Sequence, residues 1–207
     1  MAARAEQRAD GKLIAVAGSS RWGKSAWVIQ QVQGAQRIIV RDPRMEYVGP
    51  LNAQPFNDVR QLAVAVRDCG VYAGKFCYTG PDTGFNDLCR LAYAWGQLWP
   101  IVFVGEEISD VTSSGKAPGG WGELMRKGLY YGNVIYSITQ RPAESDKTVW
   151  GNATVKHVHG FTRPDDQEYV ARLLGVEQSV ITEMQPLDYV EQRIGEKEIT
   201  RGRVRFA

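Results

Sequence analysis

The chain has 207 residues, which suits one α/β domain with a substantial core and is too short for two ordinary domains and a linker. Lysine and arginine number 25 against 23 for aspartate and glutamate, so the formal net charge of +2 excludes recognition of a polyanion by overall charge. No apolar run approaches the roughly 20 residues that span a bilayer, so we expect a soluble, intracellular protein that is not itself transmembrane.

Residues 1–10 are polar and lack an apolar stripe, so we expect a flexible N-terminal arm before a single domain that spans residues 11–207. An apolar strand is predicted at residues 13–17 and a helix at residues 24–32. Between them the chain fits the phosphate-binding pattern G-x-x-x-x-G-K-[ST], with Gly18, Ser19, Ser20, Arg21, Trp22, Gly23, Lys24 and Ser25. A strand before the loop and a helix after it are the context in which such a loop binds phosphate.

Each residue type in this loop has a chemical role. The glycines let backbone N–H groups converge on phosphate oxygens, Lys24 can reach the β- and γ-phosphates, and the Ser25 hydroxyl can bind Mg²⁺. The pattern therefore predicts ATP and Mg²⁺ as ligands. The alternative is a Gly/Ser-rich turn that happens to precede Lys-Ser.

Helical and strand patterns alternate through the next part of the chain. A strand is predicted at residues 37–41, a helix at 58–68, a strand at 75–78 and a helix at 85–99. The aromatic side chains of the last helix are expected in the core. Three cysteines without C-x-x-C spacing argue against a disulfide framework or a zinc site, and we expect buried thiols.

The continuous apolar run at residues 101–104 is expected to be a strand buried on both faces, and it ends in Gly105, Glu106 and Glu107. In a phosphate-loop protein, an acid at the end of such a strand holds the Mg²⁺ shell, and a following glutamate polarises the attacking water. The alternative is a solvated charge pair where a strand ends.

Residues 112–120 are rich in Ser, Gly and Pro, with one lysine at Lys116, and predict a mobile loop before a helix at 121–130. The buried strand at 133–139 ends at Gln140, whose amide is well placed to sense a γ-phosphate, because the carboxyl ends of parallel strands line the ligand crevice.

The last third of the chain predicts a strand at 155–161, a helix at 165–174 and a hairpin formed by residues 189–194 and 198–206. His157 and His159 share one face of the strand, and because no metal set is complete there we expect them to be structural. The tail carries Arg193, Arg201, Arg203 and Arg205.

Three segments resemble the FtsK–HerA family of DNA-pumping ATPases. Residues 42–47, Asp-Pro-Arg-Met-Glu-Tyr, are similar to its D-P-x-x-E-Y segment; residues 99–110 resemble its Walker B region; and residues 138–142, Ile-Thr-Gln-Arg-Pro, resemble its A-T-Q-R-P sensor. Order and spacing agree across most of residues 12–162. The short length is most similar to the genome-packaging ATPases of tailless, membrane-containing viruses.

The resemblance implies a three-layer, RecA-like (ASCE) P-loop NTPase of the α/β class, with a mostly parallel central sheet and a C-terminal β-hairpin. It also implies that strand 134–139 lies between strands 13–17 and 101–104. The roles that it implies are phosphate and Mg²⁺ binding for Lys24 and Ser25, the Walker B acid for Glu106, the water-activating base for Glu107 and the sensor for Gln140.

The chain departs from the family pattern in two places. Gly105 and Glu106 stand where many relatives have an apolar residue and an aspartate. Leu129 stands where relatives often have an arginine, so the candidates for an arginine finger are Arg126, Lys127, Arg141 and the tail arginines.

The function that the resemblance implies is an ATP-hydrolysing translocase that packages a double-stranded viral genome into a preformed capsid. It implies a homo-hexamer that binds DNA without sequence preference, and we take Lys116 as the candidate DNA contact. Partners would be capsid-vertex or viral membrane proteins, in the host cytoplasm and the virion. The alternatives are a small P-loop kinase and a nucleotide-binding component of a membrane or secretion complex.

Overall fold

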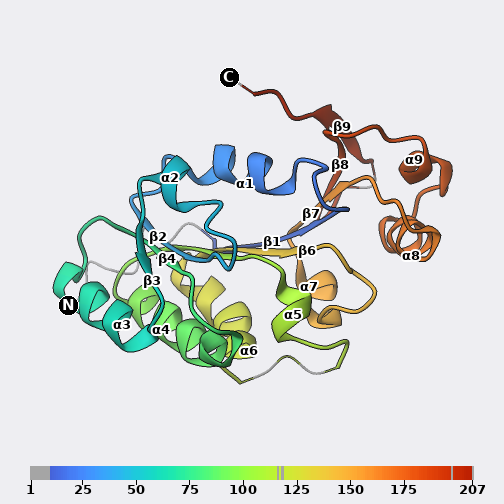
Figure 1. The fold of residues 1–207 in the computed structure, drawn as a ribbon. Helices are drawn as coiled ribbons and strands as arrows, with labels where there is room; N and C mark the ends of the chain where they lie inside the picture. The colour runs from blue at the N-terminus through green and yellow to red at the C-terminus, as the bar shows by residue number, and fades with distance from the viewer. Residues whose placement is uncertain (1–9, 116, 118, 197, 207) are drawn as a thin grey trace.

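A single mixed sheet runs through the protein (Figure 1). The computed structural model describes residues 10–115, 117, 119–196 and 198–206. In this part of the chain the strand order is β3-β4-β2-β5-β6-β1-β7-β8-β9. The strands are β1 (Lys12–Ala17), β2 (Arg37–Arg41), β3 (Gln54–Phe56), β4 (Gly74–Tyr78), β5 (Val102–Gly105), β6 (Val134–Thr139), β7 (Val155–His159), β8 (Asp188–Arg193) and β9 (Thr200–Arg203). Neighbouring strands from β3 to β7 pair in parallel, whereas β8 and β9 pair antiparallel.

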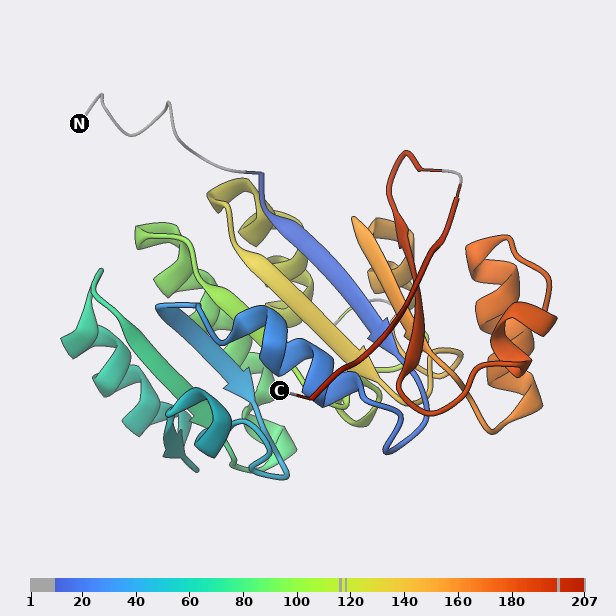
Figure 2. The same ribbon diagram turned by 90° about the horizontal axis from the view of Figure 1, so that it is seen from above.

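Helices cover both faces of this sheet, which gives three layers (Figures 1 and 2). One face carries α1 (Lys24–Val32) and α2 (Val48–Leu51). The other face carries α3 (Val59–Cys69), α4 (Phe85–Leu98), α5 (Ile108–Val111), α6 (Gly119–Lys127) and α7 (Lys147–Asn152). The helices α8 (Pro164–Leu174) and α9 (Ser179–Thr182) lie beyond β7, and the 3₁₀ turns are η1 (Asp82–Gly84) and η2 (Gly128–Tyr131).

The alternation of side chains along β1 explains why all five residues after Lys12 are apolar and buried. Leu13, Ala15 and Ala17 point into the core under α4 and α6, while Ile14 and Val16 pack toward α1. A parallel strand covered on both faces is apolar at nearly every position. β5 is covered in the same way, and so is β6, in which Ser137 and Thr139 are buried polar residues. These three strands form the centre of the sheet.

The predicted position of β6 is confirmed. It pairs with β1 on one side and with β5 on the other, with Thr139 opposite Ala17 and Ser137 opposite Gly105. The carboxyl ends of these strands therefore lie side by side. In open α/β sheets this edge is where ligands bind.

The predicted loop at residues 112–120 is too long, because α6 begins at Gly119. A Cβ added at Gly120 would lie 2.3 Å from the carbonyl oxygen of Asn86 on α4, and the Gly120 N–H donates to the Asn86 side chain at 2.8 Å. The glycines thus serve close helix packing, which overrides their poor helix propensity. Lys116 lies outside the described residues.

Several other boundaries differ from the expected ones. The sequence pattern missed the short elements α2, β3, α5, α7 and α9. The first hairpin strand begins and ends one residue earlier than predicted, and the second is shorter, Thr200–Arg203 instead of 198–206. Cys77 and Cys89 are buried as expected, but Cys69 is only partly buried. Of the expected arm at residues 1–10, the structure describes Asp10 alone. Within the described residues, the helices are too short or too polar to cross a membrane.

Candidate nucleotide-binding site

The phosphate loop joins β1 to α1 and needs glycine at two positions. Gly18 has a φ of 153° and Gly23 a φ of 104°, values that side chains with a Cβ rarely adopt. A Cβ at Gly18 would also lie only 2.6 Å from the Cβ of His159. The Ser19 N–H donates to the Gly160 carbonyl at 3.0 Å. The loop is therefore held against the end of β7.

The residues of the phosphate loop form two groups, one that packs against the end of β7 and one that lines a cavity. Gly18, Ser19 and Trp22 face the end of β7: a Cβ at Gly160 would lie 2.0 Å from the indole of Trp22, and Ser19 Oγ accepts the N–H of Thr162 at 3.0 Å. The remaining residues of the pattern line a cavity: Ser20, Arg21, Gly23, Lys24 and Ser25.

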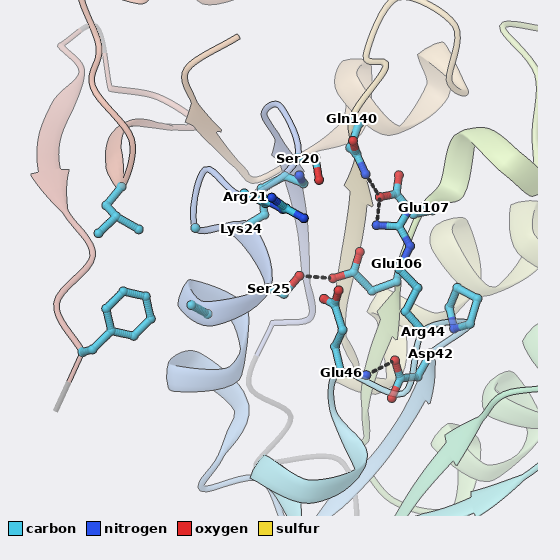
Figure 3. Close-up of a pocket in the computed structure, with 15 residues that line it drawn as sticks. Ser20, Arg21, Lys24, Ser25, Asp42, Arg44, Glu46, Glu106, Glu107 and Gln140 are labelled. Atoms are coloured by element: carbon cyan, nitrogen blue, oxygen red, sulfur yellow. Dashed lines mark hydrogen bonds and ion pairs between the residues drawn. The ribbon is translucent and has the colours of Figure 1, made fainter. Parts of the chain in front are cut away.

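Lys24 and Ser25 begin α1 and face the acidic end of β5 (Figure 3). The ammonium of Lys24, a residue only 5% exposed, donates to the Ser19 carbonyl at 3.0 Å. Burial lowers the pKa of Lys24, and the charges of Glu107 and Glu106 oppose this. Ser25 Oγ donates to Glu106 Oε1 at 3.0 Å. The predicted metal ligands are thus in direct contact.

The segment after β2 folds around the buried carboxylate of Asp42. Its two oxygens accept the N–H groups of Glu46 at 2.8 Å and of Tyr47 at 2.9 Å. The Tyr47 phenol then donates to Glu106 Oε1 at 2.5 Å. Burial raises the pKa of Glu106, whereas the hydrogen bonds from Tyr47 and Ser25 lower it.

The sequence analysis identified residues 42–47 by their similarity to the D-P-x-x-E-Y segment of the FtsK–HerA family, and it predicted no role for these residues. The structure shows that Asp42 shapes the turn and that Tyr47 orients the acid at the end of β5. The Asp-Pro pair that closes β2 is a local signal for such a turn. No local sequence pattern predicts the hydrogen bond from Tyr47 to Glu106, because these two residues lie far apart in the sequence.

Glu107 is buried at the end of β5 in a left-handed backbone conformation. It is 6% exposed and has φ 48° and ψ 55°, a left-handed conformation that costs a residue with a Cβ about 1–2 kcal/mol. The Gln140 amide donates to Glu107 Oε1, and the Arg44 guanidinium lies 3.7 Å from the same oxygen (Figure 3). The predicted base and the predicted sensor therefore meet. Strain of this kind concentrates at functional sites.

A cavity of about 460 Å³ lies between these groups. Its size falls within the range of small-ligand sites, roughly 300–1,000 Å³. It is lined by Ser20, Arg21, Gly23, Lys24, Ser25, Ala26, Asp42, Pro43, Arg44, Glu46, Glu106, Glu107, Gln140, Leu187 and Phe206. The sequence did not predict the last two, which come from the C-terminal part of the chain.

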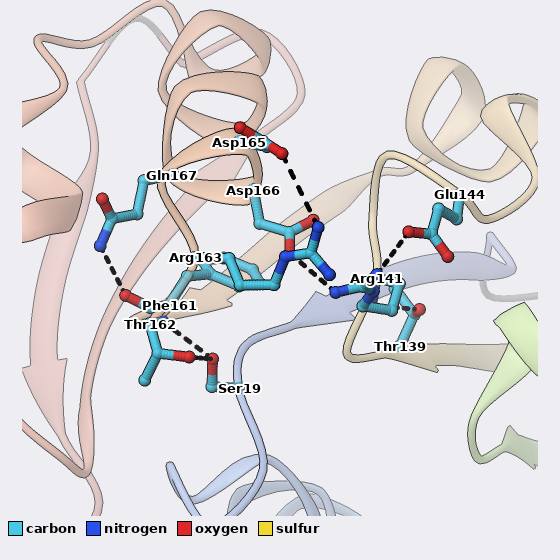
Figure 4. Close-up of polar contacts among 10 residues, drawn as sticks. All are labelled: Ser19, Thr139, Arg141, Glu144, Phe161, Thr162, Arg163, Asp165, Asp166 and Gln167. Atoms are coloured by element: carbon cyan, nitrogen blue, oxygen red, sulfur yellow. Dashed lines mark hydrogen bonds and ion pairs between the residues drawn. The ribbon is translucent and has the colours of Figure 1, made fainter.

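Arg141 does not line the cavity. Its guanidinium lies 2.6 Å from Glu144 and 3.9 Å from the buried Asp166 of α8, and Arg163 approaches Asp166 to 4.0 Å (Figure 4). The Arg141 side chain is 31% exposed. This candidate for an arginine finger is therefore tied to α8 of its own chain.

The other basic candidates on a helix, Arg126 and Lys127, occupy the last turn of α6. Lys127 pairs with Glu123 at 2.8 Å, and Arg126 is exposed. The next turn packs Leu129 against Gly11, just before β1. The end of α6 therefore lies near the amino end of β1, whereas the phosphate loop follows the carboxyl end of the same strand.

The arginines of the C-terminal part of the chain are not among the residues that line the cavity. Arg193 pairs with Glu191 at 2.7 Å and Arg203 with Asp188 at 2.7 Å, and the side chains of Arg201 and Arg205 are exposed. Arg193, Arg201 and Arg203 lie on the antiparallel strands β8 and β9, whereas Arg205 follows β9 and its carbonyl accepts a hydrogen bond from Gln30 of α1 at 2.7 Å.

The two histidines of β7 form a buried chain behind the phosphate loop. His159 Nδ1 donates to the Asp188 carbonyl at 3.0 Å, its Nε2 lies 3.2 Å from His157 Nε2, and His157 Nδ1 lies 3.1 Å from Glu191. Trp27 of α1 stacks on His157 with centroids 3.5 Å apart. Burial lowers the pKa of His159 to about 3, so this ring is neutral.

The chain is similar to viral proteins in both sequence and fold. No family model matches it. It is 35% identical to protein P9 of Pseudoalteromonas phage PM2 over 139 residues, which are 65% of this chain and 62% of that protein. The chain thus spans less than two thirds of this relative.

Solved structures match nearly the whole chain. The genome packaging NTPase B204 of Sulfolobus turreted icosahedral virus 2, in complex with ATP-gammaS, has a TM-score of 0.77 at 12% identity, over 94% of this chain and 98% of that chain. B204, the DNA-packaging ATPase of Sulfolobus turreted icosahedral virus, has a TM-score of 0.73 at 14% identity, with 94% and 98% covered. These matches confirm the predicted fold: an α/β fold with a mostly parallel central sheet and a C-terminal antiparallel hairpin, shared with the NTPase B204.

Proposed function

We propose that this chain is an ATP-hydrolysing motor that moves double-stranded DNA and packages a viral genome into a preformed capsid. The observation that carries the proposal is the contact of Gln140 with Glu107 in the cavity that also holds Lys24, Ser25 and Glu106. The shared fold with the packaging NTPase B204, a protein solved with ATP-gammaS, supports the same function.

The residues can divide hydrolysis between them. Lys24 would exchange the Ser19 carbonyl for β- and γ-phosphate oxygens. Glu107 would accept the proton of the water that attacks the γ-phosphorus, as the bond to the β-phosphate oxygen breaks. Gln140 would hold Glu107 and respond to the presence of the γ-phosphate.

The site fits Mg²⁺, which is proposed as the metal ion. Ser25 Oγ and the Glu106 carboxylate are hard oxygen donors only 3.0 Å apart, and Tyr47 orients the same carboxylate. When bound, Mg²⁺ would neutralise charge on the β- and γ-phosphates. Ser25 and Glu106 would hold the ion.

Two substitutions separate binding from catalysis. Lys24→Ala should abolish phosphate release in a folded protein, whereas Glu107→Gln should keep ATP binding and lose turnover, because an amide cannot accept the proton. Calorimetry measures binding, and phosphate release measures turnover. Turnover near that of the wild type in folded Lys24→Ala would remove the ATPase proposal. If Glu106→Gln stops hydrolysis and Glu107→Gln does not, the two acids have exchanged roles.

The motor is proposed to be a homo-hexameric ring with its sites between subunits. Among the finger candidates outside the tail, Arg126 is favoured, because it is exposed while Lys127 and Arg141 are paired within the chain. Arg126→Ala and Lys24→Ala should each be inactive alone. Mixing the two variants should restore part of the hydrolysis, because some interfaces then combine an intact loop with an intact arginine. Mixtures that stay inactive would exclude Arg126.

DNA is proposed to bind through its phosphates, which makes binding independent of sequence and steeply dependent on salt. Lys116, between the acidic strand and α6, remains the candidate contact. DNA-stimulated hydrolysis should fall with salt in the wild type, with a shallower slope in Lys116→Ala. An unchanged slope and unchanged stimulation would show that this loop does not contact DNA.

The proposed setting is the host cytoplasm and the packaging vertex of the virion, with capsid-vertex or viral membrane proteins as partners. The position of β6 between β1 and β5 counts against the kinase alternative, which we expect to have those two strands as neighbours. A scaffold of a membrane or secretion complex would lack stimulation by DNA. The salt series above therefore also separates this alternative from the motor.

A further inference from the structure

The cavity is chemically asymmetric. Toward the ends of β2, β5 and β6 its lining is polar and acidic, with Asp42, Glu106 and Gln140. On the side of the C-terminal segment it is lined by Leu187 and Phe206. Triphosphate and metal chemistry accounts for the first side and gives no role to the second.

The apolar side is fixed to the phosphate loop. The N–H of Val204 donates to the Leu187 carbonyl at 2.9 Å, and Gln30 of α1 donates to the Arg205 carbonyl at 2.7 Å. A Cβ at Gly23 would lie 3.1 Å from Leu187 Cδ2. The tail thus runs back beside α1 and the loop, as Figure 2 shows.

Two features of this side are energetically unfavourable in the chain without a ligand: a left-handed backbone at Leu187 and an exposed aromatic ring at Phe206. Leu187 has a φ of 77°, a left-handed conformation that is unusual for a branched side chain. Phe206 leaves 68% of its surface exposed while it lines the cavity. Leu187 is half-buried against the core beside Gly23, whereas the ring of Phe206 presents exposed apolar surface to the cavity.

We propose that Leu187 and Phe206 form the subsite for the base of the bound nucleotide, with the Phe206 ring stacked on the base. The inference rests on the proposed function, because it requires a nucleoside triphosphate in the cavity. Phosphates at Lys24 and the acids of β5 leave the apolar side for the base. Apolar side chains recognise the face of a ring and not its edge, so ATP and GTP should bind with similar affinity.

The test compares a nucleotide with its phosphate chain alone. Dissociation constants for ATP and for inorganic tripolyphosphate are measured by calorimetry for wild type, Phe206→Ala and Phe206→Tyr. Loss of one stacking contact should weaken ATP binding about 5- to 100-fold. Tripolyphosphate binding should stay unchanged in Phe206→Ala, and Phe206→Tyr should bind ATP as the wild type does.

Ile194→Ala is the matched control, since Ile194 is a 76% exposed apolar residue after β8 that does not line the cavity. It should bind both ligands normally. Equal ATP affinity in Phe206→Ala and wild type, or an equal loss for ATP and tripolyphosphate, would overturn the base subsite. If the wild type bound neither ligand, the ATPase proposal itself would fall as well, so the two failures are distinguishable.

Discussion

The left-handed backbone of Glu107 allows the strain at the proposed catalytic base to be measured. Glu107→Gly and Glu107→Ala both remove the carboxylate and its contacts with Gln140 and Arg44. These losses cancel when the two variants are compared. What remains is the response of the backbone, at φ 48° and ψ 55°, to the presence of a Cβ.

The size of the difference follows from two opposing effects. A Cβ in the left-handed region costs about 1–2 kcal/mol, which Glu107→Ala keeps and Glu107→Gly relieves. Glycine also gains entropy in the unfolded chain, which offsets about 0.4–1 kcal/mol of that gain. Glu107→Gly should therefore be the more stable variant by about 1 kcal/mol, or roughly 2–4 °C in Tm for a chain of this size.

Urea denaturation of the two variants, with equal m-values, measures this difference. Both should lack phosphate release, so the more stable variant is also inactive. If Glu107→Ala proved as stable as Glu107→Gly, the backbone at the end of β5 would not be strained. The inference that the chain holds this residue in place for catalysis would then be wrong.

Three further predictions test the surroundings of the loop. Tyr47→Phe removes a hydrogen bond to Glu106 and should raise the Mg²⁺ concentration needed for hydrolysis about 10- to 100-fold; an unchanged Mg²⁺ midpoint would contradict this role. Gly160→Ala places a Cβ 2.0 Å from Trp22 and should cost about 1–3 kcal/mol of stability and weaken ATP binding, while Gly151→Ala, with nothing within 4 Å, should do neither. Because burial lowers the pKa of His159 from 6.5 to about 3 on folding, the unfolded chain binds more protons below pH 6.5, so stability should fall by about 1 kcal/mol between pH 6.5 and 5.5; urea midpoints at these two pH values that coincide would exclude this contribution.

The sequence predicted the parts of the site that depend on local pattern. Residues 13–17 of β1 and the strand β5 are continuous apolar runs because both faces of each strand are covered, and β6 is mostly apolar for the same reason, so the residues after these strands could be recognised as site candidates. The contact between Glu107 and Gln140 needed the strand order as well. That order came from the family resemblance, since periodicity does not specify which strands pair.

The parts that local pattern did not predict depend on long-range contacts. The helix α6 begins at glycines because α4 packs too closely for a Cβ at Gly120. Tyr47, after β2, reaches Glu106 at the end of the neighbouring strand β5. Leu187, just before β8, and Phe206, after β9, reach the cavity from the two ends of the hairpin. Such contacts are fixed by the packed sheet and leave no periodic signal.

The end of β6 links the cavity to the C-terminal part of the protein through two consecutive residues. Gln140 contacts Glu107 inside the cavity, while Arg141 contacts Glu144 and approaches Asp166 of α8 outside it. One peptide group joins the two side chains, so a shift of Gln140 on loss of a γ-phosphate would act on Arg141 as well. The helix α8 is followed in the chain by the hairpin and by the tail that carries Phe206. The C-terminal part of the chain would therefore be coupled to the γ-phosphate through Gln140 and Arg141, and would contact the base of the same nucleotide directly. A motor needs such a connection, because hydrolysis at a buried acid must become movement at the surface of the subunit.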